Sequence, residues 1–377
     1  MKNRLKVVLY AGMYKKNQDG ATKSLYKLTD SLLNRNIEVK LLASSATPQK
    51  RDGLIITKVI GVPFFFYHDY KFSFPLPNSK KDLDKYKPDI IHIAAPDLLG
   101  IFLARYARKN NIPLFMSYHT NFPSYLKYYK IKFLLKFGWW YFHWFYNHAD
   151  IVFVPTQIVQ NELSDKGIKN TKIWSRGVNT NQFNPSKRSN KIRSEWGADG
   201  KKVILYSGRF VWYKSLRSFI EIYNLFNEKY PKNVIFVLLG SGPIEDELKK
   251  KMPEAIFPGY LSGNDLSVIY ASSDILCFPS TTETFGMVIL ESLSSGVPVV
   301  VSDIGGCQEI VINSGAGLVA KAGDADDFYN CCKKIITDKN LWESLRNNAL
   351  NYSKNRNWEN INNVVISEYY KTINGNG

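Results

Sequence analysis

Two carboxylates in one short segment are the first residues that could do chemistry. Glu283 and Glu291 lie eight positions apart between residues 279 and 309. Their neighbours are apolar or small, and a carboxylate in such surroundings needs a polar partner. Two acids on a helix more often form a solvated face, but these flanks favour a ligand hydroxyl as the partner.

The residues around the two acids predict the elements that position them. Gly286 begins a helix and Gly296 ends it, because glycine tolerates the positive φ that helix ends require. The apolar, largely β-branched run 297–301 predicts a strand covered on both faces. Glu283 then precedes the helix, where backbone N–H groups point outward, and Glu291 lies about two turns further on. We expect one carboxylate at the mouth of a cleft and the other along its wall.

Two basic residues follow another predicted strand, which ends near residue 207. Arg209 comes directly after Gly208, and Lys214 follows five residues later. Two cations at the end of a strand can neutralise a diphosphate, and arginine can bind it through two hydrogen bonds. An isolated pair of this kind is usually a surface feature. The preceding glycine and the Val-Trp between the two cations favour phosphate binding instead.

These segments together resemble a known family. The spacing of Glu283 and Glu291 resembles the Glu-x7-Glu signature of the retaining glycosyltransferases of family 4, and GRFVWYKSL resembles their phosphate-binding segment. The segment SYHTNFPSY, which contains His119, resembles the one that carries their sugar-facing histidine. The likeness is nearest to sulfolipid synthases and related α-mannosyltransferases. It implies an α/β protein of the GT-B fold, with two facing Rossmann-like domains and a deep cleft between them.

The resemblance also implies a role for each residue. His119, Arg209, Lys214 and Glu283 would be catalytic, with the two cations stabilising the leaving diphosphate and Glu283 contacting the sugar. Glu291 would bind the ribose hydroxyls. The reaction would proceed on one face of the sugar without a metal or other cofactor, the nucleotide sugar being a co-substrate. The expected donor-binding residues are Gly20, Ala21, Gly208, Arg209, Lys214, Gly240, Thr284, Phe285, Gly286, Met287 and Glu291.

The amino-terminal segment predicts the start of a Rossmann domain. A strand over 5–12 is followed by a loop at 18–21 and a helix over 22–33. In the family this loop carries two adjacent glycines, whereas here Asp19 takes the first place, before Gly20. Further along, residues 60–77 predict an irregular loop rich in aromatics and proline.

The length of 377 residues predicts two domains. We expect an acceptor-side domain over 1–188, a nucleotide-sugar domain over 189–355 and a helix over 356–377 that crosses back. The four cysteines fit neither a disulfide framework nor a zinc site, and no run of 18 apolar residues is present. We therefore expect a cytoplasmic protein, either free or peripheral at a membrane.

The charge is concentrated in the first half of the chain. Residues 1–185 hold 28 Lys and Arg against 12 Asp and Glu, while 186–377 hold 22 against 21. Segment 122–146 adds 13 of the 53 aromatic residues and four lysines. This composition predicts either a helix packed between two elements or a patch that docks on an anionic membrane. Nucleic acid is not expected as a partner, because no nucleic-acid-binding module is visible.

The function expected from the sequence is transfer of a sugar from a GDP- or UDP-sugar to a lipid or glycan acceptor, with retention of configuration. A sugar-nucleotide epimerase of the same fold is one alternative. A DNA-modifying glucosyltransferase is another, suggested only by the charge. A non-catalytic sugar-binding protein is a fourth possibility, which the presence of both acids and both cations argues against.

Overall fold

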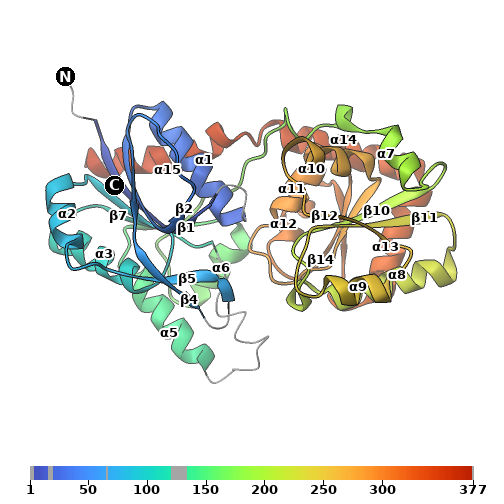
Figure 1. The fold of residues 1–377 in the computed structure, drawn as a ribbon, viewed down its shortest axis with the longest axis horizontal. Coiled ribbons are helices and arrows are strands. Elements are labelled where there is room, and N and C mark those ends of the chain that lie inside the picture. The colour runs from blue at the N-terminus through green and yellow to red at the C-terminus, as the bar shows by residue number, and fades with distance from the viewer. Residues whose placement is uncertain (1–3, 16–19, 65–66, 120–133, 376–377) are drawn as a thin grey trace. The chain divides into compact units, whose positions relative to one another are not determined.

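The computed structural model describes residues 4–15, 20–64, 67–119 and 134–375, which form two compact units (Figure 1). Unit 1 comprises Met1–Ser175 and Trp358–Gly377, and unit 2 comprises Arg176–Asn357. The sequence-based domain limits at 188 and 355 remain predictions.

Unit 1 is built on a seven-stranded parallel sheet in the order β3-β2-β1-β6-β7-β8-β9, the Rossmann order with one added strand. Val7 and Leu9 of β1 belong to the core on one face of this sheet, while Val8 and Tyr10 belong to the core on the other. The strands are β1 (Lys6–Tyr14), β2 (Glu38–Ala46), β3 (Leu54–Lys58), β6 (Ile90–Ile93), β7 (Leu114–Ser117), β8 (Ile151–Val154) and β9 (Thr171–Ile173).

The last helix of the chain belongs to unit 1. Figure 1 shows α15 (Trp358–Ile373) beside α1 (Gly20–Asn34). The side chain of Asn362 donates hydrogen bonds to the carbonyl of Lys27 at 2.8 Å and to Ser31 Oγ at 2.9 Å. The remaining described helices of this unit are α2 (Ser79–Tyr86), α3 (Leu98–Lys109), α5 (Leu134–Tyr146) and α6 (Gln157–Asp165).

The prediction of an irregular loop over 60–77 is wrong. β4 (Ile60–Phe64) and β5 (Tyr67–Phe74) form an antiparallel hairpin. The backbone N–H of Ser73 donates to Asp97 Oδ2 at 3.0 Å, which anchors the hairpin beside α3. Gly61 lies so close to β2 that a Cβ there would be 2.5 Å from Ser44 Cβ. Tertiary anchoring of this kind leaves no periodic signal in the sequence.

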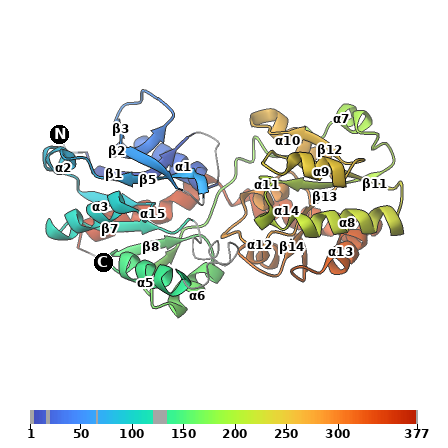
Figure 2. The same cartoon turned by 60° about the horizontal axis from the view of Figure 1, so that its bottom comes forward.

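Unit 2 repeats the Rossmann order without the extra strand: β12-β11-β10-β13-β14-β15, all parallel. Helices cover both faces of its sheet (Figure 2). The strands are β10 (Lys202–Ser207), β11 (Val234–Leu239), β12 (Ile256–Gly259), β13 (Ile275–Phe278), β14 (Val299–Ser302) and β15 (Gly317–Ala320). The helices are α7 (Asn190–Glu195), α8 (Leu216–Lys229), α9 (Glu245–Lys251), α10 (Gly263–Ser272), α11 (Met287–Ser294), α12 (Cys307–Ser314), α13 (Ala325–Thr337) and α14 (Lys339–Lys354), with short 3₁₀ helices η1 (Pro185–Lys187) and η2 (Trp212–Lys214).

The order of strands in unit 2 reverses between β10 and β13. In open parallel sheets ligands bind beyond the carboxyl ends of the strands at this switch point. The segment with Arg209 leaves β10 there, and the loop with Glu283 leaves β13 at the same edge. The strand predicted over 297–301 begins at Val299, because Pro298 has no N–H to donate to the ladder. The carbonyl of Pro298 still accepts a hydrogen bond from the N–H of Leu276 at 2.9 Å.

Candidate functional site

A buried ion pair joins the two segments at the switch point of unit 2. Lys214 Nζ lies 2.5 Å from Glu283 Oε1, and the two side chains are only 15% and 24% exposed. Burial lowers the pKa of Lys214, but the charge and hydrogen bond of Glu283 outweigh it and hold the pKa above its ordinary value. The lysine therefore stays charged at neutral pH and provides a fixed cation at the edge of the sheet.

The loop that carries Glu283 is held by the next loop along the chain. The backbone N–H of Gly306 donates to the carbonyl of Glu283 at 2.7 Å. A Cβ at Gly306 would lie 2.1 Å from the carbonyl oxygen of Thr284, so no side chain fits there. Gly286 has φ +90°, and a Cβ on it would lie 2.5 Å from Cys307 Sγ. Two glycines and a buried thiol thus fix the course of the loop.

The second acid lies on the inner side of α11. Glu291 is only 6% exposed, and its Oε2 accepts a hydrogen bond from the hydroxyl of Tyr270 at 3.2 Å. The same hydroxyl lies 2.8 Å from Oγ of Ser207, the last residue of β10. The carboxylate is therefore linked to the strand from which the basic segment leaves.

The glycines at the ends of β10 and β11 are in direct contact. A Cβ at Gly240 would lie 1.9 Å from the carbonyl oxygen of Gly208, and the φ of Gly240 is +141°. The N–H of Phe210 donates to the carbonyl of Ser241 at 2.9 Å, which closes the two loops against each other. Arg209 is exposed between them. The glycines therefore allow the two loops to pack against each other where the basic segment begins.

The amino end of α11 directly follows the loop that carries Glu283. Gly286 is the residue before the helix and Met287 is its first residue, while Phe285 is 4% exposed and packs in the core of unit 2. The first N–H groups of a helix have no partner within it and carry partial positive charge. Together with Lys214 they offer positive potential to an anion such as a phosphate.

Comparison with known proteins identifies the family. Residues 18–182 match the model described as Glycosyltransferase Family 4, and residues 188–352 match that described as Glycosyl transferases group 1. The chain belongs to these glycosyltransferases. It is an enzyme of the GT-B fold, as the Glu-x7-Glu spacing and the basic segment indicate.

Relatives of this glycosyltransferase support the assignment. It is 30% identical to the sulfoquinovosyl transferase SQD2 of Arabidopsis thaliana over 84% of its own length and 66% of that protein. It is 27% identical to a GDP-mannose-dependent alpha-mannosyltransferase of Corynebacterium glutamicum, over 98% and 89% of the two chains. Its fold matches that of the sucrose-phosphate synthase of Thermosynechococcus elongatus with a TM-score of 0.77, at 20% identity and covering 99% and 100% of the two chains.

The predicted site residues of unit 1 are Gly20, Ala21 and His119. Gly20 and Ala21 form the start of α1. His119 follows β7, and its ring lies 5.7 Å from that of Trp174, centroid to centroid. The rest of the segment SYHTNFPSY falls largely in 120–133, outside the described residues. A role for His119 toward the sugar stays a prediction.

Three residues of the site were not expected from the sequence. Tyr270 contacts Glu291, Ser207 contacts Tyr270, and Gly306 donates to the carbonyl of Glu283. None of the three is among the predicted site residues. The Gly-Gly pair two residues after Asp303 was the one available signal, because adjacent glycines often mark a close approach of backbone.

Other features of the described residues bear on earlier expectations. All four cysteines are free thiols. Among the residues with described positions, no group of three or more His, Cys, Asp or Glu side chains is suited to hold a metal ion. None of the described helices is long and apolar enough to cross a membrane.

Proposed function

We propose that this glycosyltransferase moves a sugar from a nucleoside diphosphate donor, a GDP- or UDP-sugar, to a hydroxyl of a lipid or glycan, with retention of configuration and without a metal ion. The observation that carries the proposal is the buried pair of Lys214 and Glu283 beside the amino end of α11. It combines a phosphate-binding cation with a hydroxyl-binding carboxylate. A mannosyltransferase relative that uses GDP-mannose supports a nucleoside diphosphate donor.

In this proposal the bond between the anomeric carbon and the diphosphate oxygen breaks while the acceptor oxygen bonds to the same face of the sugar. The acceptor proton passes to the departing diphosphate oxygen. Lys214 and Arg209 stabilise the negative charge that grows on the diphosphate, helped by the helix N–H groups. Glu283 accepts hydrogen bonds from the sugar, and Glu291 accepts them from the ribose. His119 donates a hydrogen bond to the sugar.

The reaction is tested with UDP-glucose and GDP-mannose as donors, each with diacylglycerol or a soluble oligosaccharide as acceptor. NMR of the product is expected to show the anomeric configuration of the donor, and added EDTA is expected to leave the rate unchanged. An inverted product would contradict retention, and loss of activity in EDTA that Mn²⁺ restores would contradict metal independence. Conversion of the nucleotide sugar to an epimer without any acceptor would instead support the epimerase.

We further propose that the acceptor reaches the enzyme at an anionic membrane surface bound by unit 1. Phe137 and Trp140 of α5 are 62% and 61% exposed, whereas Phe145 and Tyr146 on its other side are buried in the core. The described part of 122–146 is thus a packed helix that also exposes aromatic side chains. Ile60 of β4, in the same unit, is 56% exposed.

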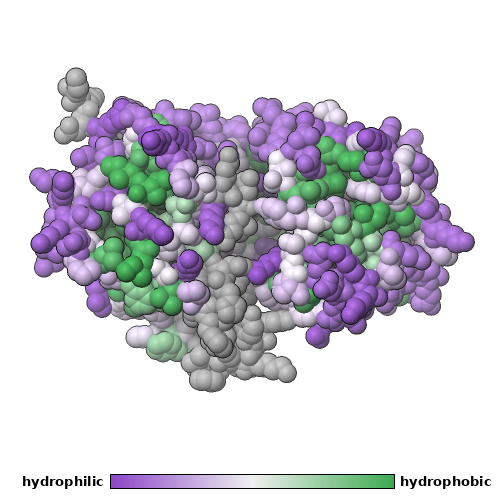
Figure 3. All heavy atoms as spheres, in the orientation of Figure 1, coloured by the Kyte–Doolittle hydropathy of each residue, from purple (hydrophilic) through white to green (hydrophobic). Residues whose placement is uncertain are grey.

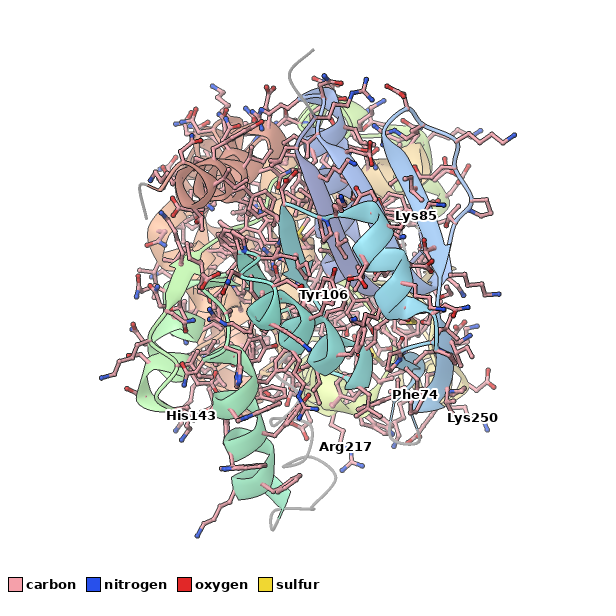
Figure 4. The ribbon with its side chains drawn as sticks, turned by 90° about the vertical axis from the view of Figure 1, so that its left-hand side faces the viewer. Phe74, Lys85, Tyr106, His143, Arg217 and Lys250 are labelled. Atoms are coloured by element: carbon pink, nitrogen blue, oxygen red, sulfur yellow. The ribbon has the colours of Figure 1, made fainter. Side chains whose placement is uncertain are left out.

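The net positive charge of unit 1 also favours an anionic membrane as its partner. Unit 1 holds 28 Lys and Arg against 14 Asp and Glu, a balance of +14. Hydrophobic residues gather in patches among hydrophilic ones on this unit, as they do on unit 2 (Figure 3). In Figure 4, α5, which carries His143, extends downward from unit 1, and Phe74 of the hairpin lies on the lower side of the same unit. Exposed aromatic side chains on a protein with an excess of cations are typical of binding to anionic lipid surfaces.

Co-sedimentation tests the membrane proposal. The protein is expected to bind vesicles of phosphatidylcholine with phosphatidylglycerol more than vesicles of phosphatidylcholine alone, and less at high salt. The double variant Phe137→Ser with Trp140→Ser should lose much of this binding. The matched control Ile312→Ser removes a side chain of unit 2 that is 67% exposed and should bind normally. Equal binding by the two variants would contradict a contact through α5.

A further inference from the structure

Tyr270 is a buried tyrosine that connects two parts of the donor site. It lies on α10, is 0% exposed, and its hydroxyl is within hydrogen-bond distance of both Glu291 Oε2 and Ser207 Oγ. The three residues come from three elements, α10, α11 and β10, and are separated by 21 and 63 positions in the sequence.

The hydroxyl of Tyr270 has one proton, so it can donate a hydrogen bond to only one of these two neighbours. A carboxylate only accepts hydrogen bonds, whereas a serine hydroxyl both donates and accepts. The arrangement that satisfies all three groups has Ser207 donating to the tyrosine oxygen and Tyr270 donating to Glu291. Burial and the nearby carboxylate raise the pKa of Tyr270 well above its ordinary value, so that the proton remains on the tyrosine.

The ring of Tyr270 is itself held in place. It lies edge-on to the ring of Phe183, with centroids 5.7 Å apart. The carbonyl of Phe183 accepts a hydrogen bond at 2.6 Å from the hydroxyl of Ser294, one turn beyond Glu291 on α11. The tyrosine therefore has a fixed position relative to the helix that carries the acid.

We propose that Tyr270 is a positioning residue for nucleotide binding: with Ser207 it holds the carboxylate of Glu291 in the orientation that receives the ribose hydroxyls of the donor. The inference rests on the proposed function, in which Glu291 binds the ribose. Since Tyr270 is fully buried, it acts on the donor through Glu291 rather than by touching it. The same hydroxyl ties this carboxylate to Ser207 at the end of β10.

The test compares Tyr270→Phe with the matched control Tyr223→Phe. Both changes delete one hydroxyl from a buried ring, and the hydroxyl of Tyr223 accepts from the N–H of Glu254 at 3.3 Å, on α8 rather than at the switch point. Calorimetry with UDP and GDP is expected to show affinity about tenfold weaker for Tyr270→Phe, as for loss of one hydrogen bond to a charged group. Affinity for inorganic pyrophosphate, which has no ribose, should be unchanged. Tyr223→Phe should match the wild type with all three ligands.

A double-mutant cycle separates this inference from the proposed function. Glu291→Gln alone should weaken nucleotide binding, and adding Tyr270→Phe to it should cost little more. If Glu291→Gln weakens binding while Tyr270→Phe does not, the positioning role is overturned and the ribose role of Glu291 stands. If neither change weakens nucleotide binding, both the positioning role of Tyr270 and the ribose role of Glu291 are overturned. Equal losses of nucleotide and pyrophosphate affinity would show general damage and overturn the inference. Should Tyr270→Phe not fold, Ser207→Ala interrupts the same network from its other end and must give the same selective loss.

Discussion

Unit 1 and unit 2 share one order of strands but differ in the loops and helices attached to them. In unit 2 the loops at the switch point contact one another so closely that Gly240 and Gly306 leave no space for a Cβ. In unit 1, α5 presents exposed aromatic side chains, and the unit has a net charge of +14 against +3 for unit 2. The same scaffold therefore carries closely packed loops at the switch point in unit 2 and exposed aromatic side chains on α5 in unit 1.

The largest effect is expected from removing the cation of unit 2. Lys214→Ala deletes the proposed stabiliser of the leaving group and leaves Glu283 without its partner, so kcat should fall on the order of 100-fold or more. Steady-state kinetics at saturating donor measures the change. Lys229→Ala, which breaks an exposed pair with Asp326 on the same unit, is the control and should leave kcat near normal. A near-normal kcat for Lys214→Ala would refute its role.

Lowering the pH should reduce the stability of unit 1 more than that of unit 2. His92 is buried between Tyr369 and Ser117, and burial lowers its pKa to about 3. An unfolded chain takes up this proton below about pH 6.5, so the folded state loses stability as the pH falls from there toward 3, by about 2–3 kcal/mol at about pH 4.5. His92 lies in unit 1, so unit 1 is the part expected to weaken.

Hydrogen exchange across this pH range, read by mass spectrometry, reports the two units separately. Protection should fall in unit 1 before unit 2, and His92→Gln should reduce the pH dependence of unit 1. Equal loss of protection in both units would contradict the comparison.

Filling the close contact at Gly306 should disturb the loop that carries Glu283. Gly306→Ala places a Cβ against the carbonyl of Thr284 and should displace the loop with Glu283, lowering the free energy of unfolding by about 1–3 kcal/mol and raising the donor KM. The control Gly323→Ala meets open space at φ +77° and should cost about 1 kcal/mol from backbone strain without changing KM. Chemical denaturation and donor kinetics measure both quantities. An unchanged KM in Gly306→Ala would show that the loop tolerates displacement.

The smallest effect is expected at the ribose position. Glu291→Ala should raise the donor KM about tenfold while lowering kcat less, because binding to the ribose is the same in the ground and transition states. Initial rates over a range of donor concentrations separate the two constants. A fall in kcat with KM unchanged would assign Glu291 to the chemical step.

Short-range patterns predicted unit 2 well. Gly286 before α11 and the basic residues after β10 lie in continuous segments whose local order is encoded by neighbouring residues. The two Rossmann sheets could be expected from strands that alternate with helices. The start of β14 was misplaced by two residues because Pro298 cannot donate to the ladder.

Contacts between distant residues could not be predicted in the same way. Tyr270 reaches Glu291 from another helix, and nothing in the spacing of a lone tyrosine indicates which carboxylate it will meet. The hairpin of β4 and β5 depends on Asp97, 24 positions beyond Ser73. Buried polar pairs of this kind depend on tertiary packing. The hydrophobic periodicity of a sequence predicts helices and strands but not which distant residues will pair.

The place of α15 has a consequence for the order in which the chain acquires its structure during synthesis. Val365, Ile366 and Tyr369 fill the core against β1 and α1, although the whole of unit 2 lies between them in the sequence. The ribosome therefore releases every residue of unit 2 before unit 1 can close one face of its sheet. We expect nascent chains that end at residue 357 to hold a folded unit 2 beside a unit 1 whose apolar face still requires protection by chaperones.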